Sequence, residues 1–272
     1  MSKIFKNNNF DTSYKKRPND EYKNMIDKLP EEYKQKLDRQ RNVILSIVVV
    51  FVIGLIVILA FTGLGVDDTI SGQIFVGASE RSLSFFGDSF TEGYVVEEGE
   101  DDYICEYTYA DAAADEILKE YPDVELDITN DGITGDVAED NSYTRVDENT
   151  EIVIMLYGLN NFLEGEDYEG VLEANITGLE TNGSIVFLVT YPVYDGGEYE
   201  DEVTACNEYI EEVSESEDVV LLDAASQFNT LISDGQYTQD ELFSSDHLHL
   251  SETGYQELGE YVGGILCTVE VE

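Results

Sequence analysis

Positive charge is almost absent from this chain after residue 64. Residues 65–272 contain three basic side chains against 52 acidic ones, which gives this region a formal net charge of −49 at pH 7. A region this acidic repels the phosphate backbones of DNA and RNA and the surfaces of anionic membranes. We therefore exclude nucleic acid as a partner. Apolar residues make up 42% of the chain, so the acidity does not indicate an intrinsically disordered protein.

Cysteine and tryptophan are also scarce. Tryptophan is absent, and the three cysteines, Cys105, Cys206 and Cys267, lie far apart without the Cys-x-x-Cys spacing of a zinc site. An odd number of cysteines excludes a complete disulfide framework. One disulfide with one free thiol stays open for an extracellular domain, but we expect three small buried hydrophobic side chains. We expect no metal ion or other cofactor.

Histidine occurs only twice, as His247 and His249. Asp246 lies three residues before the second of them. A serine hydroxyl is a weak nucleophile unless a base removes its proton, so serine-based catalysis in this chain depends on one of these two rings.

A serine in a suitable position follows the short apolar run Leu83–Phe86. This run indicates a buried strand, and it ends in Gly87-Asp88-Ser89. A serine at the end of a strand lies at the rim of a sheet, where α/β folds bind their ligands.

In these motifs the chain resembles the SGNH hydrolases, also called the GDSL-type esterases, over residues 80–272. The first block of that family is Gly-Asp-Ser, and the last is Asp-x-x-His, which Asp246 and His249 match. Between these blocks the family carries a glycine and an asparagine, which Gly135 and Asn160 match. The four blocks occur in the family's order, each close to the end of an expected strand or before the last expected helix.

The resemblance implies a serine ester hydrolase that needs no cofactor. Ser89 would be the nucleophile, His249 the general base and Asp246 the residue that orients the imidazole. The oxyanion hole would consist of the backbone N–H groups of Ser89 and Gly135 and the side-chain amide of Asn160.

Four positions close to these blocks allow other interpretations. Asn161 occupies the last position of a block that is usually Gly-x-Asn-Asp, so the local turn departs from the family pattern. Thr91 stands where a Gly-x-Ser-x-Gly elbow would have glycine, which argues against the α/β-hydrolase fold. His247 is the rival base, but its spacing from Asp246 does not fit the block. Asp88 is expected to form hydrogen bonds within a tight turn rather than to act in catalysis.

The longest apolar run begins at residue 43. Val43–Phe61 carries no charge, and the residues up to 64 extend it to the length that a helix needs to cross the ~30 Å hydrocarbon core of a bilayer. A buried core helix and a cleaved signal peptide are the alternatives. The long preceding segment and the lack of a clear Ala-x-Ala site argue against cleavage. We expect a transmembrane signal anchor at 43–64, which contacts the lipid bilayer.

The charges that flank this run predict its orientation. Residues 1–42 contain 11 basic and 7 acidic residues, whereas Asp67 and Asp68 follow the run. Because positive residues stay inside, we expect 1–42 to be a cytoplasmic basic tail. A linker at 65–79 would then join the anchor to an extracellular hydrolase domain at 80–272. The chain would be a single-pass protein of the cell membrane.

Strand and helix patterns alternate from residue 82 onward. The expected strands are Leu83–Phe86, Val124–Ile128, Ile152–Tyr157, Ile185–Thr190 and Val219–Leu222. The expected helices are Tyr107–Glu120, Tyr168–Leu179, Asp201–Glu215, Ala224–Ile232 and Glu252–Ile265. This alternation predicts an α/β fold, a three-layer α/β/α sandwich around a five-stranded parallel sheet, and the resemblance implies the SGNH-hydrolase, flavodoxin-like form of it.

Residue types, topology and resemblance together indicate an outward-facing esterase. We expect it to hydrolyse small O-acyl esters, most simply acetyl, on cell-wall or extracellular carbohydrate. A lipase or lysophospholipase and a non-catalytic surface module with the same fold are the alternatives. Tyr157, Tyr191 and Tyr194 fall near expected strand ends, where they would either line a sugar site or serve as general surface residues.

Overall fold

The computed structural model describes residues 72–99, 101–166, 168 and 170–271. All of these residues belong to one compact unit. The predicted cytoplasmic tail and transmembrane anchor lie outside the described residues. Within the described ranges, no helix combines the length and the hydropathy that crossing a membrane requires.

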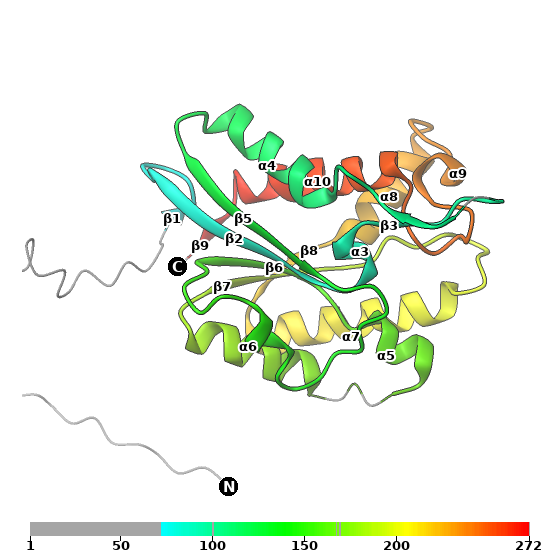
Figure 1. Ribbon diagram of the computed structural model, residues 1–272, viewed down its shortest axis with the longest axis horizontal. Helices are drawn as coiled ribbons and strands as arrows, with labels where there is room; N and C mark the ends of the chain where they lie inside the picture. The colour runs from blue at the N-terminus through cyan, green and yellow to red at the C-terminus, as the bar shows by residue number, and fades with distance from the viewer. Residues whose placement is uncertain (1–71, 100, 167, 169, 272) are drawn as a thin grey trace, which may run out of the picture. The chain divides into compact units, whose positions relative to one another are not determined.

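The centre of this unit is a sheet of five parallel strands (Figure 1). Its order is β5-β2-β6-β7-β8. Their bounds are β2 Glu80–Gly87, β5 Glu125–Gly132, β6 Ile152–Leu156, β7 Ile185–Val189 and β8 Val220–Leu222. The chain proceeds from β2 to one neighbour, β5, and then to the other, β6. The order therefore reverses at β2, and a doubly wound sheet binds its ligand beside the carboxyl end of such a strand.

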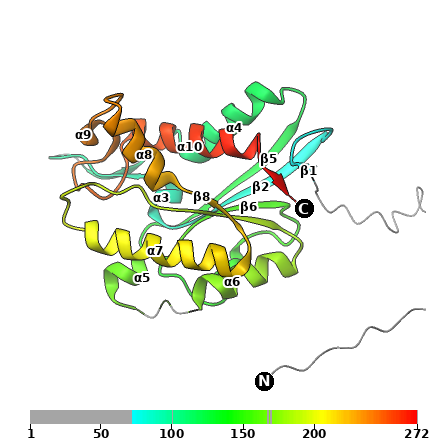
Figure 2. The ribbon, with the colours of Figure 1, turned by 180° about the vertical axis from the view of Figure 1, so that it is seen from behind.

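Helices cover both faces of the sheet, as Figures 1 and 2 show. One face carries α4 Tyr109–Glu120, α8 Ala224–Ser233 and α10 Glu252–Leu266. The other carries α5 Leu159–Glu164, α6 Val171–Thr181 and α7 Glu200–Glu217. This arrangement confirms the predicted three-layer α/β/α sandwich, and each predicted strand and helix has a counterpart.

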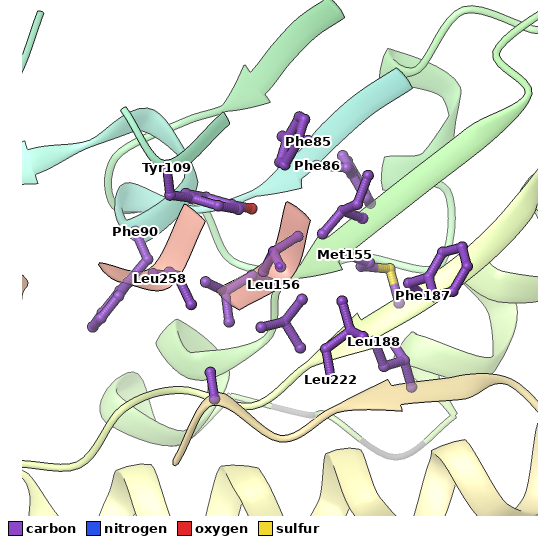
Figure 3. Close-up of a cluster of buried hydrophobic side chains, with 14 of the residues drawn as sticks. Phe85, Phe86, Phe90, Tyr109, Met155, Leu156, Phe187, Leu188, Leu222 and Leu258 are labelled. Atoms are coloured by element: carbon purple, nitrogen blue, oxygen red, sulfur yellow. The ribbon is translucent and has the colours of Figure 1, made fainter. Parts of the chain in front are cut away.

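The core lies where the sheet meets these helices. All five residues of β6 are buried, because β6 is central in the sheet and both of its faces are covered. Figure 3 shows buried side chains from four neighbouring strands, among them Phe85, Met155, Phe187 and Leu222. By contrast, β5 is an edge strand, and its side chains are partly exposed. It therefore tolerates polar residues and extends four residues beyond the predicted end at residue 128.

Two glycines of α10 allow that helix to pack closely on α4. A Cβ on Gly259 would lie 2.4 Å from the Cβ of Ala112 and 2.4 Å from the carbonyl oxygen of Tyr109. A Cβ on Gly263 would lie 2.7 Å from the carbonyl oxygen of Ala113. Contacts this short do not occur, so only glycine fits at this helix–helix contact.

The predicted linker at 65–79 needs a correction in the part that the structure describes. Strand β1, Gly72–Gln73, pairs with β9, Glu270–Val271, in an antiparallel ladder. The next two residues, Ile74 and Phe75, are buried in the core. Hydrophobic burial therefore places the start of the domain before residue 80.

Short elements that the sequence patterns did not predict surround the carboxyl ends of the strands. They are α3 Ser89–Glu92, the hairpin of β3 Tyr94–Val95 and β4 Tyr103–Ile104, the 3₁₀ helix η1 Ser142–Arg145, and α9 Gln239–Leu242. The three cysteines are free and buried, as expected.

Candidate active site

The predicted nucleophile lies in a tight turn between β2 and α3. Asp88 forms the N-cap of α3, where its carboxylate accepts a hydrogen bond of 3.1 Å from the backbone N–H of Phe90. Gly87 is required before it, because a Cβ there would lie 2.0 Å from the carbonyl oxygen of Leu156. Ser89 is then the first residue of the helix, with 6% of its surface exposed.

Ser89, His249 and Asp246 form a continuous chain of two hydrogen bonds. The distance from Ser89 Oγ to His249 Nε2 is 2.8 Å, and the distance from His249 Nδ1 to Asp246 Oδ2 is 2.6 Å. The other carboxylate oxygen of Asp246 accepts bonds of 3.1 Å from the backbone N–H groups of Leu248 and His249. The carboxylate therefore fixes both the loop and the ring of His249.

The histidine ring is also held by its neighbours. Phe90 and Tyr94 pack against it, with ring centroids 5.3 Å and 4.9 Å away. The loop before it is held against the residue that follows strand β3, because Ser245 donates a bond of 3.0 Å from its backbone N–H to the carbonyl oxygen of Val96. Phe90 and Tyr94 are site residues that sequence reasoning missed, although both lie within five residues of Ser89.

The rival candidate base, His247, is directed elsewhere: Ser89 is hydrogen-bonded to His249. Its exposed ring stacks on Tyr194 at a centroid distance of 4.1 Å. Tyr194 is partly exposed, whereas Tyr157 and Tyr191 are buried, with 1% and 0% of their surfaces accessible. Tyr157 and Tyr191 therefore cannot line a sugar site. Each of these two tyrosines follows closely after a buried strand, β6 or β7, and its ring belongs to the same hydrophobic core.

Two carboxylates of the site have displaced pKa values in opposite directions. Burial by itself would raise the pKa of Asp246, but hydrogen bonds from the His249 ring and two backbone N–H groups lower it below its ordinary value. For Asp88 burial prevails and raises the pKa to about 6, although the hydroxyl of Tyr191 and the N–H of Phe90 oppose the shift. Asp246 is therefore held as the anion, which suits a residue that stabilises an imidazolium.

Both predicted oxyanion residues lie at the carboxyl ends of the strands that flank β2. Gly135 follows β5 and has a φ of +74°, a conformation that favours glycine. Its loop is tied to the nucleophile turn by a bond of 3.2 Å from the N–H of Ile133 to the carbonyl oxygen of Gly87. Asn160 lies in the first turn of α5, after β6, and its Nδ2 donates to the carbonyl oxygen of Asp136 at 2.9 Å.

The departure from the family pattern at Asn161 has a structural explanation. Its Oδ1 accepts from the backbone N–H of Ala138 at 2.9 Å, and its Nδ2 donates to the carbonyl oxygen of Ala138 at 3.0 Å. An aspartate could accept the first bond but, when ionised, could not donate the second. Asn161 thereby anchors the segment that follows Gly135.

The arrangement suits nucleophilic attack on a carbonyl group. A serine hydroxyl, a hydrogen-bonded imidazole and a carboxylate on the far nitrogen are the components of a serine triad. In the described part of the chain, no group of three or more histidine, cysteine and acidic side chains is arranged to bind a metal ion.

Comparison with known proteins agrees with this geometry. The model of the GDSL-like Lipase/Acylhydrolase family matches residues 85–257, which is more than half of the chain. A search of the curated proteins found no match.

Several solved structures have the same fold. The chain is 21% identical to a lipase/acylhydrolase from Enterococcus faecalis, with a TM-score of 0.52 over 68% of this chain and 95% of that one. It is 18% identical to a member of the lipolytic protein G-D-S-L family from Veillonella parvula, with a TM-score of 0.51 over 68% and 97% of the two chains. It is also 18% identical to an acetylxylan esterase from Geobacillus stearothermophilus, with a TM-score of 0.55 over 73% and 99%.

These identities show a shared fold, whereas the family model extends over the segment that holds Ser89, Gly135, Asn160, Asp246 and His249. The chain therefore belongs to the GDSL-like lipase/acylhydrolase family and is an ester hydrolase.

Proposed function

We propose that this protein is a membrane-anchored serine esterase that removes small O-acyl groups, above all acetyl, from carbohydrate outside the cell. The observation that carries the proposal is the hydrogen-bonded chain Ser89–His249–Asp246 in a member of an acylhydrolase family. The choice of an acetylated carbohydrate is supported by the fold shared with an acetylxylan esterase. The outward orientation is supported by the charge pattern around residues 43–64.

In the proposed acylation step, His249 Nε2 takes the proton of Ser89 while Ser89 Oγ attacks the ester carbonyl. The imidazolium that forms is stabilised by the carboxylate of Asp246, 2.6 Å from the other ring nitrogen. The tetrahedral oxyanion is held by the backbone N–H groups of Ser89 and Gly135 and by the amide of Asn160. Collapse of the intermediate expels the sugar alcohol, which receives the proton from His249.

Deacylation repeats these steps with water as the nucleophile. His249 takes a proton from water, and the hydroxide equivalent attacks the acyl-Ser89 ester. The same three donors hold the second oxyanion, and the proton returns to Ser89 Oγ as the carboxylic acid leaves. Each removed acyl group thus consumes one molecule of water.

The negative charge of the domain bears on the choice among ester substrates. With 52 acidic residues against three basic ones after residue 64, the domain repels anionic lipid surfaces. A neutral, acetylated sugar carries no such penalty. This charge argument favours the carbohydrate over the phospholipid as substrate.

Chain-length preference tests the substrate proposal. The purified full-length protein is assayed on 4-nitrophenyl esters from acetate to octanoate and on acetylated xylo-oligosaccharides, with Ser89→Ala as the blank. We expect the highest kcat/KM on acetyl esters and release of acetate from the oligosaccharides. A maximum at eight carbons with no acetate release would overturn the proposal in favour of a lipase.

A protection experiment tests the orientation. Protease added to intact cells should remove the domain that carries Ser89 and leave residues 1–42 undigested. Recovery of a soluble form that begins near residue 65 would instead show that the apolar run is cleaved as a signal peptide.

A further inference from the structure

Asp136, directly after Gly135, has contacts on both its backbone and its side chain. Its carbonyl oxygen accepts the bond from Asn160 Nδ2 at 2.9 Å. Its carboxylate oxygen Oδ2 accepts from Arg145 Nη1 at 2.6 Å and also from the hydroxyl of Tyr157. Asp136 therefore joins the two proposed oxyanion residues, Gly135 and Asn160, to a partly buried ion pair.

Arg145 is fixed in place by more than this carboxylate. Its Nη2 donates to the carbonyl oxygen of Gly87 at 3.4 Å, in the turn that carries the nucleophile. Its guanidinium carbon lies 4.9 Å from the ring centroid of Phe86 and 5.3 Å from that of Tyr157. One guanidinium group thus bridges the nucleophile turn and the segment after Gly135.

We propose that Arg145 is a positioning residue for the oxyanion hole. By holding Asp136, it fixes the carbonyl oxygen that orients the amide of Asn160, and it neutralises the carboxylate next to Gly135. This inference rests on the proposed role of Gly135 and Asn160 in stabilising the oxyanion.

The bond to Asp136 orients the side-chain amide of Asn160. A carboxamide has two N–H bonds in one plane. When the carbonyl oxygen of Asp136 accepts one of them, the torsion of the Asn160 side chain is set, and the other N–H has a fixed direction. Oxyanion stabilisation depends on donors that are already in place when charge develops. If Arg145 no longer holds Asp136, the oxyanion hole therefore keeps all of its donors but binds the oxyanion more weakly.

Arg145 also places a positive charge beside the carboxylate of Asp136. A negative carboxylate beside an oxyanion donor opposes the negative charge that forms in the transition state. The guanidinium group of Arg145 offsets this repulsion, because its Nη1 lies 2.6 Å from Asp136 Oδ2. The arginine side chain is only 25% exposed, so water screens the pair weakly. Lysine cannot take its place, because a single ammonium group lacks the planar fork that reaches both Asp136 and Gly87.

The segment after Gly135 has other anchors, so loss of Arg145 should leave it folded. Asn161 holds both backbone groups of Ala138. Asn175 accepts from the N–H of Tyr143 at 2.6 Å and donates to the carbonyl oxygen of Glu139 at 2.8 Å. A variant at residue 145 therefore reports on the oxyanion hole rather than on global folding.

Arg81 offers a matched control. It also pairs with a carboxylate, with 3.3 Å between its Nη1 and Glu151 Oε1, and its side chain is 19% exposed. It lies in β2 six residues before Gly87, towards the opposite end of the sheet from the triad. Arg81→Ala removes an arginine–carboxylate pair of the same kind without touching Asp136.

The test compares kcat and KM of the full-length wild type, Arg145→Ala and Arg81→Ala on 4-nitrophenyl acetate. Because complete loss of one oxyanion donor costs about 10²–10³ in rate, we expect the misoriented amide in Arg145→Ala to lower kcat roughly 10–100-fold. We expect KM to stay within about twofold, and Arg81→Ala to keep the wild-type kcat. Added guanidinium chloride at 10 mM should restore part of the kcat of Arg145→Ala, and sodium chloride at the same concentration should not.

Tyr157→Phe gives a second measurement that does not depend on Arg145→Ala folding. It keeps the ring and removes only the hydroxyl that binds Asp136, so kcat should fall several-fold with KM unchanged. Wild-type kcat in either correctly folded variant, or an equal loss in Arg81→Ala, would overturn the inference. Failure of the wild type itself to hydrolyse esters would instead refute the proposed function, so the two failures are distinguishable.

Discussion

The carboxylate of Asp88 accepts a hydrogen bond of 2.6 Å from the hydroxyl of Tyr191 in the interior of the domain. Both side chains are buried, and each follows a different strand of the sheet. The hydroxyl of Tyr191 also accepts from the backbone N–H of Leu159 at 3.4 Å. This pair therefore connects the residue before Ser89 to the helix that carries Asn160.

The raised pKa of Asp88 predicts a pH-dependent contribution to stability. Burial raises its pKa to about 6 from an ordinary value of 3.8, so between these two pH values the folded protein retains a proton that the unfolded chain has already lost. The contribution of Asp88 is thus fully present below pH 3.8 and is lost as pH rises through 6. A shift of this size corresponds to about 3 kcal/mol.

Asp88→Asn tests this prediction, because asparagine keeps the N-cap bond but does not titrate. Urea unfolding of the wild type and the variant is compared from pH 4 to pH 7.5. The stability of the wild type relative to the variant should fall by roughly 2–2.5 kcal/mol between pH 4 and pH 7 and stay constant above pH 7. A difference that is independent of pH, or that grows as pH rises, would show that Asp88 is not a buried acid of raised pKa.

Asp246→Asn should remove most of the activity while keeping the loop intact. The asparagine Oδ1 can still accept from the N–H groups of Leu248 and His249, but its NH₂ group would face His249 Nδ1. The ring would then present its protonated nitrogen to Ser89, the wrong tautomer for a base, and the analogous change in a serine protease lowers kcat on the order of 10⁴-fold. Steady-state kinetics measures the loss. A kcat within tenfold of the wild type would show that Asp246 does not set the tautomer of His249.

Two glycines of α10 provide a paired test of the packing between α10 and α4. Gly259→Ala places a methyl group 2.4 Å from Ala112, so we expect it to lower the free energy of unfolding by about 1–3 kcal/mol. A Cβ on Gly264 would have no neighbour within 4 Å. Gly264→Ala should therefore raise the free energy of unfolding by about 0.5–1 kcal/mol, because alanine has the higher helix propensity. Thermal and urea unfolding measure both changes. Equal effects of the two variants would contradict the close contact.

The central elements of the fold were predictable because their sequence signals are local. The five predicted apolar runs, including the one before Gly87, correspond to the strands of the central sheet. The helices predicted between them cover both faces of that sheet. The observed ends of an element differ from the predicted ends where tertiary contacts determine them. In the edge strand β5, for example, the polar last residues still pair with β2. The pairing of residues 72–73 with 270–271 joins the two ends of the domain, and no local pattern reveals such a contact.

The grouping of the candidate catalytic residues was predictable as far as they belong to family motifs, whereas their roles stay a prediction. Ser89, Asp246 and His249 come together although 160 positions separate the first from the last. The support for these residues was not predictable. Tyr157 and Tyr191 interact through hydroxyl groups whose partners, Asp136 and Asp88, lie on other strands or loops. Arg145 carried one signal, since it is one of three basic residues after residue 64.

The most direct test of the account is to identify the residue that becomes covalently modified. Full-length protein is treated with a fluorophosphonate, which reacts with activated serine hydroxyls, and the adduct is located by mass spectrometry after digestion. The account predicts a single stoichiometric adduct on Ser89, its absence in His249→Ala, and loss of esterase activity in parallel with labelling. An adduct on another residue, or full activity with Ser89 modified, would contradict the assignment of Ser89 as the nucleophile.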